Sequence, residues 1–157
     1  MAETLGSLCD KLTIVKLKQF HSTDAARLTS LAAQETNLRR EIDEYLAAAS
    51  CGAIPVERMT FAANKVFKKE GNAVAEVLGN IGQVFAQLAD VNCRLWHEQE
   101  KVYDFAAVHA DDKDRVVKQL ALLNLERNKC IDSIDRQLVD LVEGHNTPNI
   151  REVATCI

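Results

Sequence analysis

Two histidines in the chain have neighbours that suit a binding site. His21 and His97 each follow a large aromatic residue, and each precedes an acid by three positions, Asp24 and Glu100 respectively. A spacing of three places both side chains on one face of a helix, and helical bundles use histidine and carboxylate ligands at this separation. We therefore predict that His21, His97 and Glu100 bind a ligand. The alternative is that each histidine lies at a helix end and pairs locally, with Asp24 acting as a helix cap.

Two basic residues accompany these histidines on the same predicted helix faces. Lys18 and Arg94 each lie three residues before a histidine, so the two halves of the chain could together cradle a phosphate or carboxylate. On this interpretation Lys18 and Arg94 are ligand-binding residues; the alternative places their stems over the core and their charged heads in water. No metal and no cofactor is predicted. The histidine and acid come in the reverse of the Glu-x-x-His order of di-metal bundles, and no second pair of inward glutamates is evident.

A further pair of charged residues falls where the hydrophobic pattern expects apolar side chains. Glu35 and Arg127 occupy equivalent positions 92 residues apart. One interpretation pairs them near the bundle axis, where a buried ion pair would set the helix register at little gain in stability. The other sends each side chain separately to solvent. The sequence contains no phosphate-binding loop, dinucleotide fingerprint, HExxH motif or nucleophile elbow.

The elements that must position these residues are helices. Apolar residues recur at steps of three and four along four segments, residues 3–21, 25–48, 73–105 and 113–143. Their heptad rhythm favours nearly aligned packing, which predicts an all-α fold, a four-helix bundle in a single domain. Its parts are a first hairpin (3–48), a linker (50–72) with a short connecting helix at 58–69, a second hairpin (73–143) that Gly144 ends, and a tail (144–157).

The two predicted hairpins look like copies of one another. Residues 5–21 align with residues 81–97 at an offset of 76, and the partner helices align at an offset of 92. The identical pairs in the first alignment are Gly6/Gly82, Leu12/Leu88, Val15/Val91 and His21/His97. Shared heptads explain the aliphatic matches, whereas the glycine and histidine matches favour duplication. We expect both glycines to allow close backbone approach, and the two histidines to meet if the first helices are parallel neighbours. The core is expected to contain Leu12, Leu88, Val91 and Ile134.

The composition limits what the protein does and where it acts. The chain has 157 residues, of which 47% are hydrophobic and only 6 are Gly and 2 Pro, and its formal net charge is −4. It is therefore too apolar for a disordered tail, too poor in turn residues for a β-barrel, and too acidic for general nucleic-acid binding. We expect no signal peptide and no membrane-spanning helix. Five cysteines without a C-x-x-C pair suit inert thiols in a reducing cytoplasm.

Three segments resemble motifs of an uncharacterised bacterial family of small helical proteins. Residues 5–18, LGSLCDKLTIVKLK, are similar to its D-K-L-(S/T)-I opening, and residues 88–104, LADVNCRLWHEQEKVYD, contain its W-H-x-x-E element. Residues 125–138, LERNKCIDSIDRQL, resemble the motif that follows. Members of this family often occur near genes for surface-polysaccharide sugar transfer. The resemblance implies an accessory role in that process and no established chemistry.

The predicted architecture favours a structural role over catalysis. A third helix of about 33 residues would be roughly 50 Å long, and a 157-residue bundle cannot easily cover that length on every side. We therefore predict a non-enzymatic scaffold or interaction module that forms homo-oligomers or binds a protein partner. The alternative is a small-molecule-binding protein or metal-assisted enzyme that uses His21, His97 and Glu100.

Overall fold

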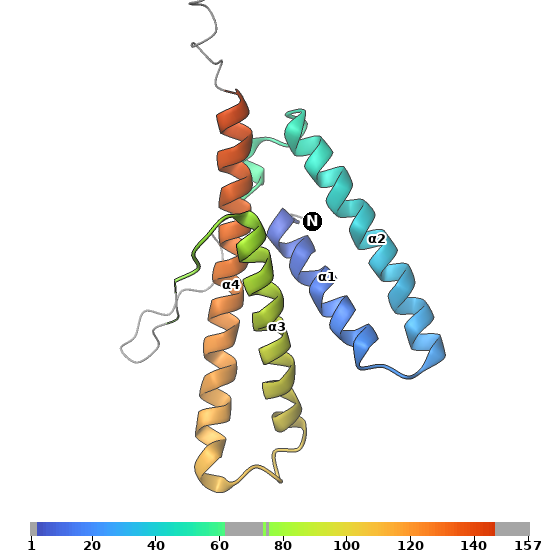
Figure 1. Cartoon of the computed structure of the whole chain (residues 1–157), viewed down its shortest axis with the longest axis vertical. Coiled ribbons are helices and arrows are strands. Elements are labelled where there is room, and N and C mark those ends of the chain that lie inside the picture. The colour runs from blue at the N-terminus through green and yellow to red at the C-terminus, as the bar shows by residue number, and fades with distance from the viewer. Residues whose placement is uncertain (1–2, 62–73, 75, 147–157) are drawn as a thin grey trace, which may run out of the picture.

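The structure, a computed structural model, describes residues 3–61, 74 and 76–146 (Figure 1). The described residues form four α-helices and one turn of 3-10 helix, and they contain no strand. The elements are α1 (Leu5–Phe20), α2 (Ala25–Ser50), the 3-10 turn η1 (Val56–Arg58), α3 (Ile81–Tyr103) and α4 (Ala110–Asn146). The predicted all-α, four-helix fold is confirmed. Within these residues, no helix combines the length and hydrophobicity that crossing a membrane requires.

Helices α1 and α3 each begin with a capping box. The Thr4 side chain accepts a hydrogen bond from the Ser7 backbone, and the Ser7 side chain accepts one from the Thr4 backbone. Asn80 and Gln83 make the same reciprocal pair at the start of α3. Such capping boxes satisfy backbone donors that the first helical turn leaves unpaired. The two boxes therefore set the starts of both helices in equivalent sequence registers, 76 residues apart.

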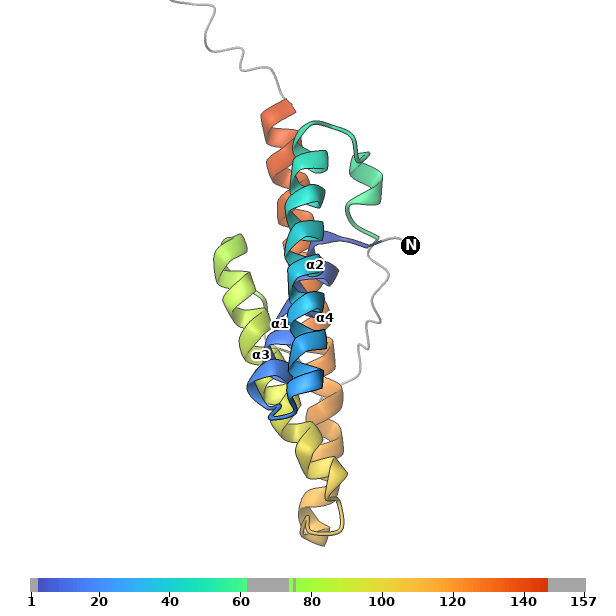
Figure 2. The ribbon, with the colours of Figure 1, turned by 90° about the vertical axis from the view of Figure 1, so that its right-hand side faces the viewer.

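Helix α1 lies at the centre of the helical bundle. It packs against α2, α3 and α4, and α4 packs along both α1 and α3. In Figure 1, α1 and α3 lie side by side and run in the same direction. In Figure 2, α2 is nearest the viewer with α1 behind it. Helix α2 packs chiefly on α1 and leaves α3 uncovered along much of that side.

The core is built from two groups of buried side chains. The larger group joins α1, α3 and α4 to the C-terminal end of α2 and to Met59, which follows η1; its members are Leu5, Cys9, Ala49, Met59, Val84, Leu88, Cys130, Ile134 and Leu138. The smaller group lies between α1 and α2 and consists of Leu8, Val15, Leu31 and Leu38. The predicted core residues Leu88, Val91 and Ile134 are buried, whereas Leu12 is only partly buried at the edge of the smaller group.

Several helix boundaries differ from the prediction. Helix α3 begins at Ile81 rather than near residue 73, because Gly79 has a positive φ of 108° and Asn80 caps the helix behind it. Helix α4 continues through Gly144 to Asn146, so Gly144 does not end it. Helix formation through one glycine costs only about 1 kcal/mol, which the long packed helix tolerates. The connecting helix predicted at residues 58–69 is not formed at its start: the 3-10 turn η1 ends at Arg58, and residues 59–61 are not helical. Residues 62–69 of that segment lie outside the described residues.

The two glycines that the repeat makes equivalent have different surroundings. A Cβ added to Gly6 would lie 2.5 Å from the backbone oxygen of Ile131 in α4, whereas a Cβ added to Gly82 would meet only the Asn80 side chain at 3.6 Å. Gly6 therefore allows the close approach of α1 to α4. The same expectation for Gly82 is wrong, because the one heavy atom near a Cβ at Gly82 belongs to the Asn80 side chain beside it and not to the backbone of another helix.

This difference predicts opposite effects for the same substitution. We expect Gly6→Ala to lower the free energy of unfolding by about 1–3 kcal/mol, because the backbone oxygen facing it cannot move without shifting α4. Gly82→Ala should leave stability unchanged or raise it by up to about 1 kcal/mol, because alanine loses less entropy in a helix. Urea unfolding of both variants tests the pair. Equal effects would contradict the contact assigned to Gly6.

A buried carboxylate lies beside the same contact. Asp135 of α4 is almost fully buried, and its Oδ1 accepts a hydrogen bond from the Gly6 backbone N–H at 2.7 Å. Burial raises the pKa of Asp135 from 3.8 to about 6, because loss of hydration outweighs the hydrogen bond that favours the charged form. The folded protein therefore holds the Asp135 proton more tightly than the unfolded chain. The resulting stabilisation is present at acid pH and is lost as the pH rises through about 6.

Asp135→Asn should remove this pH dependence. The asparagine keeps an oxygen for the Gly6 N–H but carries no charge, so we expect the variant to be about 2–3 kcal/mol more stable than the native protein at pH 7. Near pH 4 the two proteins should be nearly equal, because Asp135 is then largely protonated in the native protein. Urea unfolding at both pH values measures the difference, with the exposed Asp140→Asn as control. A difference independent of pH would contradict the assignment.

Candidate functional site

The end of α1 meets the middle of α3 through three rings. His21, which terminates α1, stacks on Trp96 of α3 with ring centroids 4.8 Å apart and an interplanar angle of 13°. The His21 and His97 rings meet edge to face at 6.1 Å. The expectation that the two histidines lie close together if their helices are parallel neighbours is confirmed. Helices α1 and α3 lie side by side and run in the same direction (Figure 1), and they start 76 residues apart, so residues separated by this offset lie at similar levels.

Glu100 holds two of these side chains. Trp96 Nε1 donates to Glu100 Oε1 at 2.9 Å, and His97 Nδ1 lies 3.3 Å from Glu100 Oε2. These hydrogen bonds lower the pKa of Glu100, with a smaller contribution from the nearby imidazoles. The carboxylate therefore orients both the indole and the imidazole one turn before it. We call His21, Trp96, His97 and Glu100 the aromatic cluster.

The remaining predicted site residues lie apart from this cluster. Arg94 Nη2 donates to Glu126 of α4 at 2.7 Å, and its Nε lies 3.8 Å from Asp90. Lys18 is half-buried on α1 and has no contact with the cluster among the described residues. Asp24 caps α2 by accepting from the Arg27 backbone N–H at 2.7 Å, as its alternative interpretation predicted.

The geometry gives the cluster no anion cradle. Arg94 pairs with Glu126 of α4 and with Asp90 of its own helix, so the predicted joint anion cradle with Lys18 is not assembled. In the described part of the chain, no group of three or more His, Cys, Asp or Glu side chains is arranged to hold a metal ion. The cluster brings an indole, two imidazoles and a carboxylate to one place, groups that can stack on a flat ligand and form hydrogen bonds.

A buried polar network joins α1, α3 and α4 at the level of the core. Arg127 of α4 donates from Nε to Asp10 Oδ1 at 2.7 Å and from Nη2 to Asp10 Oδ2. Asn92 of α3 donates from Nδ2 to the same Asp10 Oδ1 at 2.9 Å and to Thr13 Oγ1 at 2.7 Å. The hydrogen bond with Asp10 raises the pKa of Arg127, so the guanidinium stays charged. We call Asp10, Thr13, Asn92 and Arg127 the buried network.

The interpretation that paired Glu35 with Arg127 is wrong, because Arg127 pairs with Asp10. Glu35 of α2 instead accepts from Gln19 at 3.0 Å and from Lys16 at 3.2 Å, both on α1. The two residues cannot meet because α1 separates α2 from α4, and each finds a partner on the face of α1 that it contacts. The sequence analysis did not identify Asn92 as a member of this network. The signal that could have found it is a polar residue on the predicted helix directly after the core position Val91.

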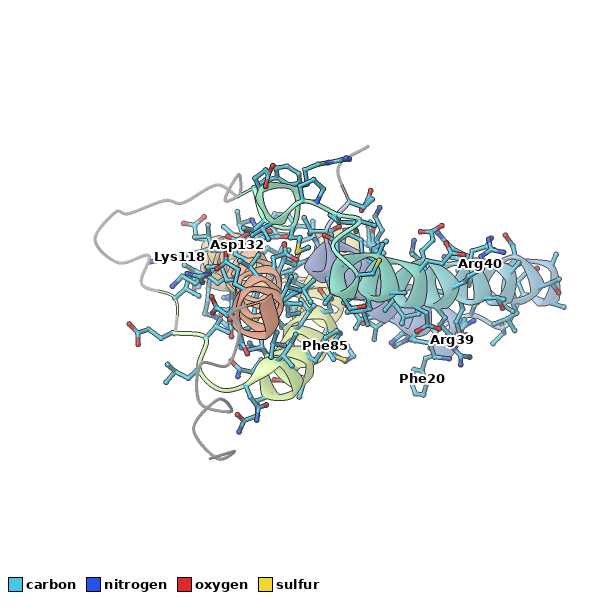
Figure 3. All side chains as sticks on the ribbon, turned by 90° about the horizontal axis from the view of Figure 1, so that it is seen from above. Phe20, Arg39, Arg40, Phe85, Lys118 and Asp132 are labelled. Atoms are coloured by element: carbon cyan, nitrogen blue, oxygen red, sulfur yellow. The ribbon has the colours of Figure 1, made fainter. Side chains whose placement is uncertain are left out.

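A cavity and a groove lie beside the aromatic cluster and the buried network. A cavity of about 380 Å³ between α1, α3 and α4 is bounded by Trp96 of the cluster and by Asn92 and Arg127 of the network. A wider, shallow groove of about 750 Å³ runs between α1 and α3, lined by Thr13, Lys16, Leu17, Gln19, Phe20, Ala89 and Cys93. Phe20 is 85% exposed at the end of this groove, and in Figure 3 its ring extends away from the helices.

The two buried cysteines are poor nucleophiles. Cys9 and Cys130 are buried, and burial raises their pKa values to about 12 and about 11. A thiol held protonated in this way is a poor nucleophile. Cys51 is exposed, Cys93 is partly buried in the groove, and Cys156 lies outside the described residues.

Trp96 is the single tryptophan of the chain and reports on the cluster. His21→Ala removes the ring that stacks on this indole, so we expect the intensity and emission maximum of Trp96 fluorescence to change. His109→Ala, which alters an exposed histidine in the turn between α3 and α4, should leave both unchanged. A Trp96 emission spectrum unaffected by His21→Ala would show that the stacked pair does not form in solution.

Comparisons with known proteins add nothing to this geometry. No family model, no curated protein and no solved structure matches the chain.

Proposed function

We propose that the protein is a non-enzymatic interaction module that forms a homodimer through the groove between α1 and α3. The observation that carries this proposal is an apolar groove with a protruding phenyl ring at its end. Helix α2 packs on another side of α1 and leaves the groove open. An exposed apolar surface of this kind usually marks an interaction site.

A second copy of the chain is the occupant that the groove favours. The surface presents a hollow and a protruding Phe20 together, so it is complementary to itself. In a two-fold dimer, each copy would place its Phe20 ring in the groove of the other, which is the isologous arrangement of most homodimers. Lys16 at the groove is paired with Glu35 of α2, so the patch presents little unpaired charge to oppose the approach of an identical surface.

The mass of the full-length protein in solution tests this proposal. We expect a dimer by size-exclusion chromatography with light scattering, and a monomer for Phe20→Ser at the same concentration. Because Phe20 is 85% exposed, the substitution should leave thermal unfolding of the monomer unchanged. Val117→Ser, which removes an exposed apolar side chain on α4, is the matched control and should remain dimeric. A monomeric native protein, or a Phe20→Ser variant that stays dimeric, would refute the proposal.

We infer that the two hairpins arose by duplication. The capping boxes 76 residues apart and the meeting of His21 with His97 support this inference. The unequal surroundings of Gly6 and Gly82 indicate that the two halves have since diverged. The cysteine pattern suggests a cytoplasmic protein, and the motif resemblance suggests a bacterial protein that is accessory to surface-polysaccharide synthesis.

The aromatic cluster supports a second candidate function, binding of a small molecule or metal-assisted chemistry. Its basis is that His21, Trp96 and His97 meet beside the Glu100 carboxylate. Titration with Zn²⁺, followed through Trp96 fluorescence, tests the metal-assisted form. Saturable quenching that His97→Ala removes would favour a metal site. Quenching that is absent, or that persists in His97→Ala, would leave the cluster as a stacked polar contact between α1 and α3.

A further inference from the structure

The groove between α1 and α3 has two unlike ends. At one end the Phe20 side chain is 85% exposed, and at the other the small residues Thr13 of α1 and Ala89 of α3 line the groove. Helices α1 and α3 run side by side in the same direction (Figure 1) and start 76 residues apart, so Thr13 and Ala89 lie at similar levels. Thr13 precedes Phe20 by seven residues of α1, which is about 10 Å along the helix axis. The groove therefore combines a protruding ring at one end with small side chains at the other.

The positions of these two ends decide how a second copy is oriented. A two-fold axis that lies in the interface runs either along the helices or across them. An axis along the helices makes the copies parallel, so the two Phe20 rings meet at the same end and the space beside Thr13 and Ala89 stays empty. An axis across the helices makes the copies antiparallel, and each Phe20 ring then reaches the end of the other groove where Thr13 and Ala89 lie. Interfaces pack at their centre as densely as protein interiors, which favours the antiparallel arrangement.

We propose that the homodimer is antiparallel and that the Phe20 ring of each copy packs against Thr13 and Ala89 of the other. This inference rests on the proposed function, because it requires that the groove binds a second copy. The two-fold axis then crosses each copy midway between the levels of Thr13 and Phe20. Leu17 of α1 lies close to that level, and so does Cys93 of α3 by the offset of 76 residues. Both side chains line the groove, so the two Cys93 thiols face each other across the axis.

The charges along the groove do not oppose this arrangement. Lys16 is the one charged side chain among the described residues that line the groove, and it lies beside the axis. Its Nζ is 3.2 Å from Glu35 of α2, so each copy brings an ion pair without net charge to the axis. The other residues that line the groove are uncharged, so the Phe20 ring enters it without removing the hydration of a charge.

Filling the space beside Ala89 tests where the ring binds. Ala89 lines the groove and is partly exposed, so the larger side chain of Ala89→Leu extends into the groove while Phe20 is unaltered. We expect this full-length variant to be a monomer by size-exclusion chromatography with light scattering, at a concentration where the native protein is a dimer. Ala121→Leu adds the same bulk to an exposed alanine of α4 and should remain dimeric. Circular dichroism should show the same helix content in all three proteins.

Cross-linking through Cys93 tests the position of the axis without added bulk. In the full-length protein with Cys51→Ser and Cys156→Ser, Cys93 is the remaining thiol that is not buried. A disulfide needs Cα atoms about 4.4–6.8 Å apart, which helices packed face to face at about 8–10 Å allow. Diamide takes up the two hydrogens that two thiols lose when a disulfide forms. We expect most of the chain to become a covalent dimer that dithiothreitol reverses, and adding Cys93→Ser or Phe20→Ser should prevent it.

The outcomes separate this inference from the proposed function. A monomeric native protein overturns both. If Phe20→Ser dissociates the native dimer but Ala89→Leu leaves it intact, the groove forms a dimer and the assigned contact of Phe20 with Ala89 is wrong. If the native dimer fails to cross-link through Cys93, the two-fold axis lies elsewhere and the antiparallel register is overturned.

Discussion

Leu88→Ala should lower the free energy of unfolding by about 2–5 kcal/mol, the range expected when a large buried side chain leaves a cavity. Leu88 is 0% exposed and belongs to the larger core group, where α1, α3 and α4 meet. Three helices surround the side chain, so local collapse cannot refill the space without moving one of them. Urea unfolding followed by circular dichroism measures the change.

A leucine outside the core provides the control for this prediction. Leu78 precedes α3 and is 67% exposed, so Leu78→Ala should change the free energy of unfolding by less than about 0.5 kcal/mol. A cost of only a few tenths of a kcal/mol for Leu88→Ala would remove Leu88 from the core. It would also overturn the packing of α3 against its two neighbours. Should Leu88→Ala fail to fold, Leu88→Val removes less volume and should give a smaller, measurable loss.

Arg127→Met should destabilise the protein by about 3–5 kcal/mol, because it leaves the Asp10 carboxylate buried without its counter-charge. The Asp10 side chain is 5% exposed, and Arg127 supplies two of its hydrogen bonds. Methionine keeps much of the length and apolar contact of arginine, so the variant isolates the loss of the charge and its donors. Among the described residues, only the Asn92 amide would still donate to this carboxylate.

A double variant and an exposed pair separate this effect from general loss of packing. Asp10→Asn combined with Arg127→Met removes both charges and should recover more than half of the lost stability. Lys16→Met breaks the exposed pair with Glu35 and should cost less than about 1 kcal/mol. If Arg127→Met costs no more than Lys16→Met, the buried network does not stabilise the contact of α1 with α3 and α4.

The helices were predictable because the information that forms them is local. Apolar spacing predicted four helices, and the caps Thr4, Asp24 and Asn80 are residues whose side chains accept from the turn that follows. The start of α3 was misplaced because Val74 and Val77 continue the apolar spacing. The positive φ of Gly79 breaks the helix there, and periodicity does not report it.

The candidate site was predictable in part for the same reason. The offset of 76 residues placed His21 and His97 at equivalent helix positions, and the spacing of three placed Glu100 beside His97. The parallel arrangement of α1 and α3 was a condition that the sequence left open. Lys18 and Arg94 share the helical spacing of the histidines, yet Arg94 turns to Glu126 because α4 lies on that side.

What the sequence by itself determined, then, is the set of helices and the cap Asp24, which depend on residues a few positions apart. Only the tertiary structure decided which charged groups meet. Asp10 and Arg127 lie 117 residues apart and pair because α4 packs on α1, whereas Glu35 is kept from Arg127 because α1 lies between their helices. Helix–helix contacts of this range follow from how whole faces pack, and no local spacing encodes them.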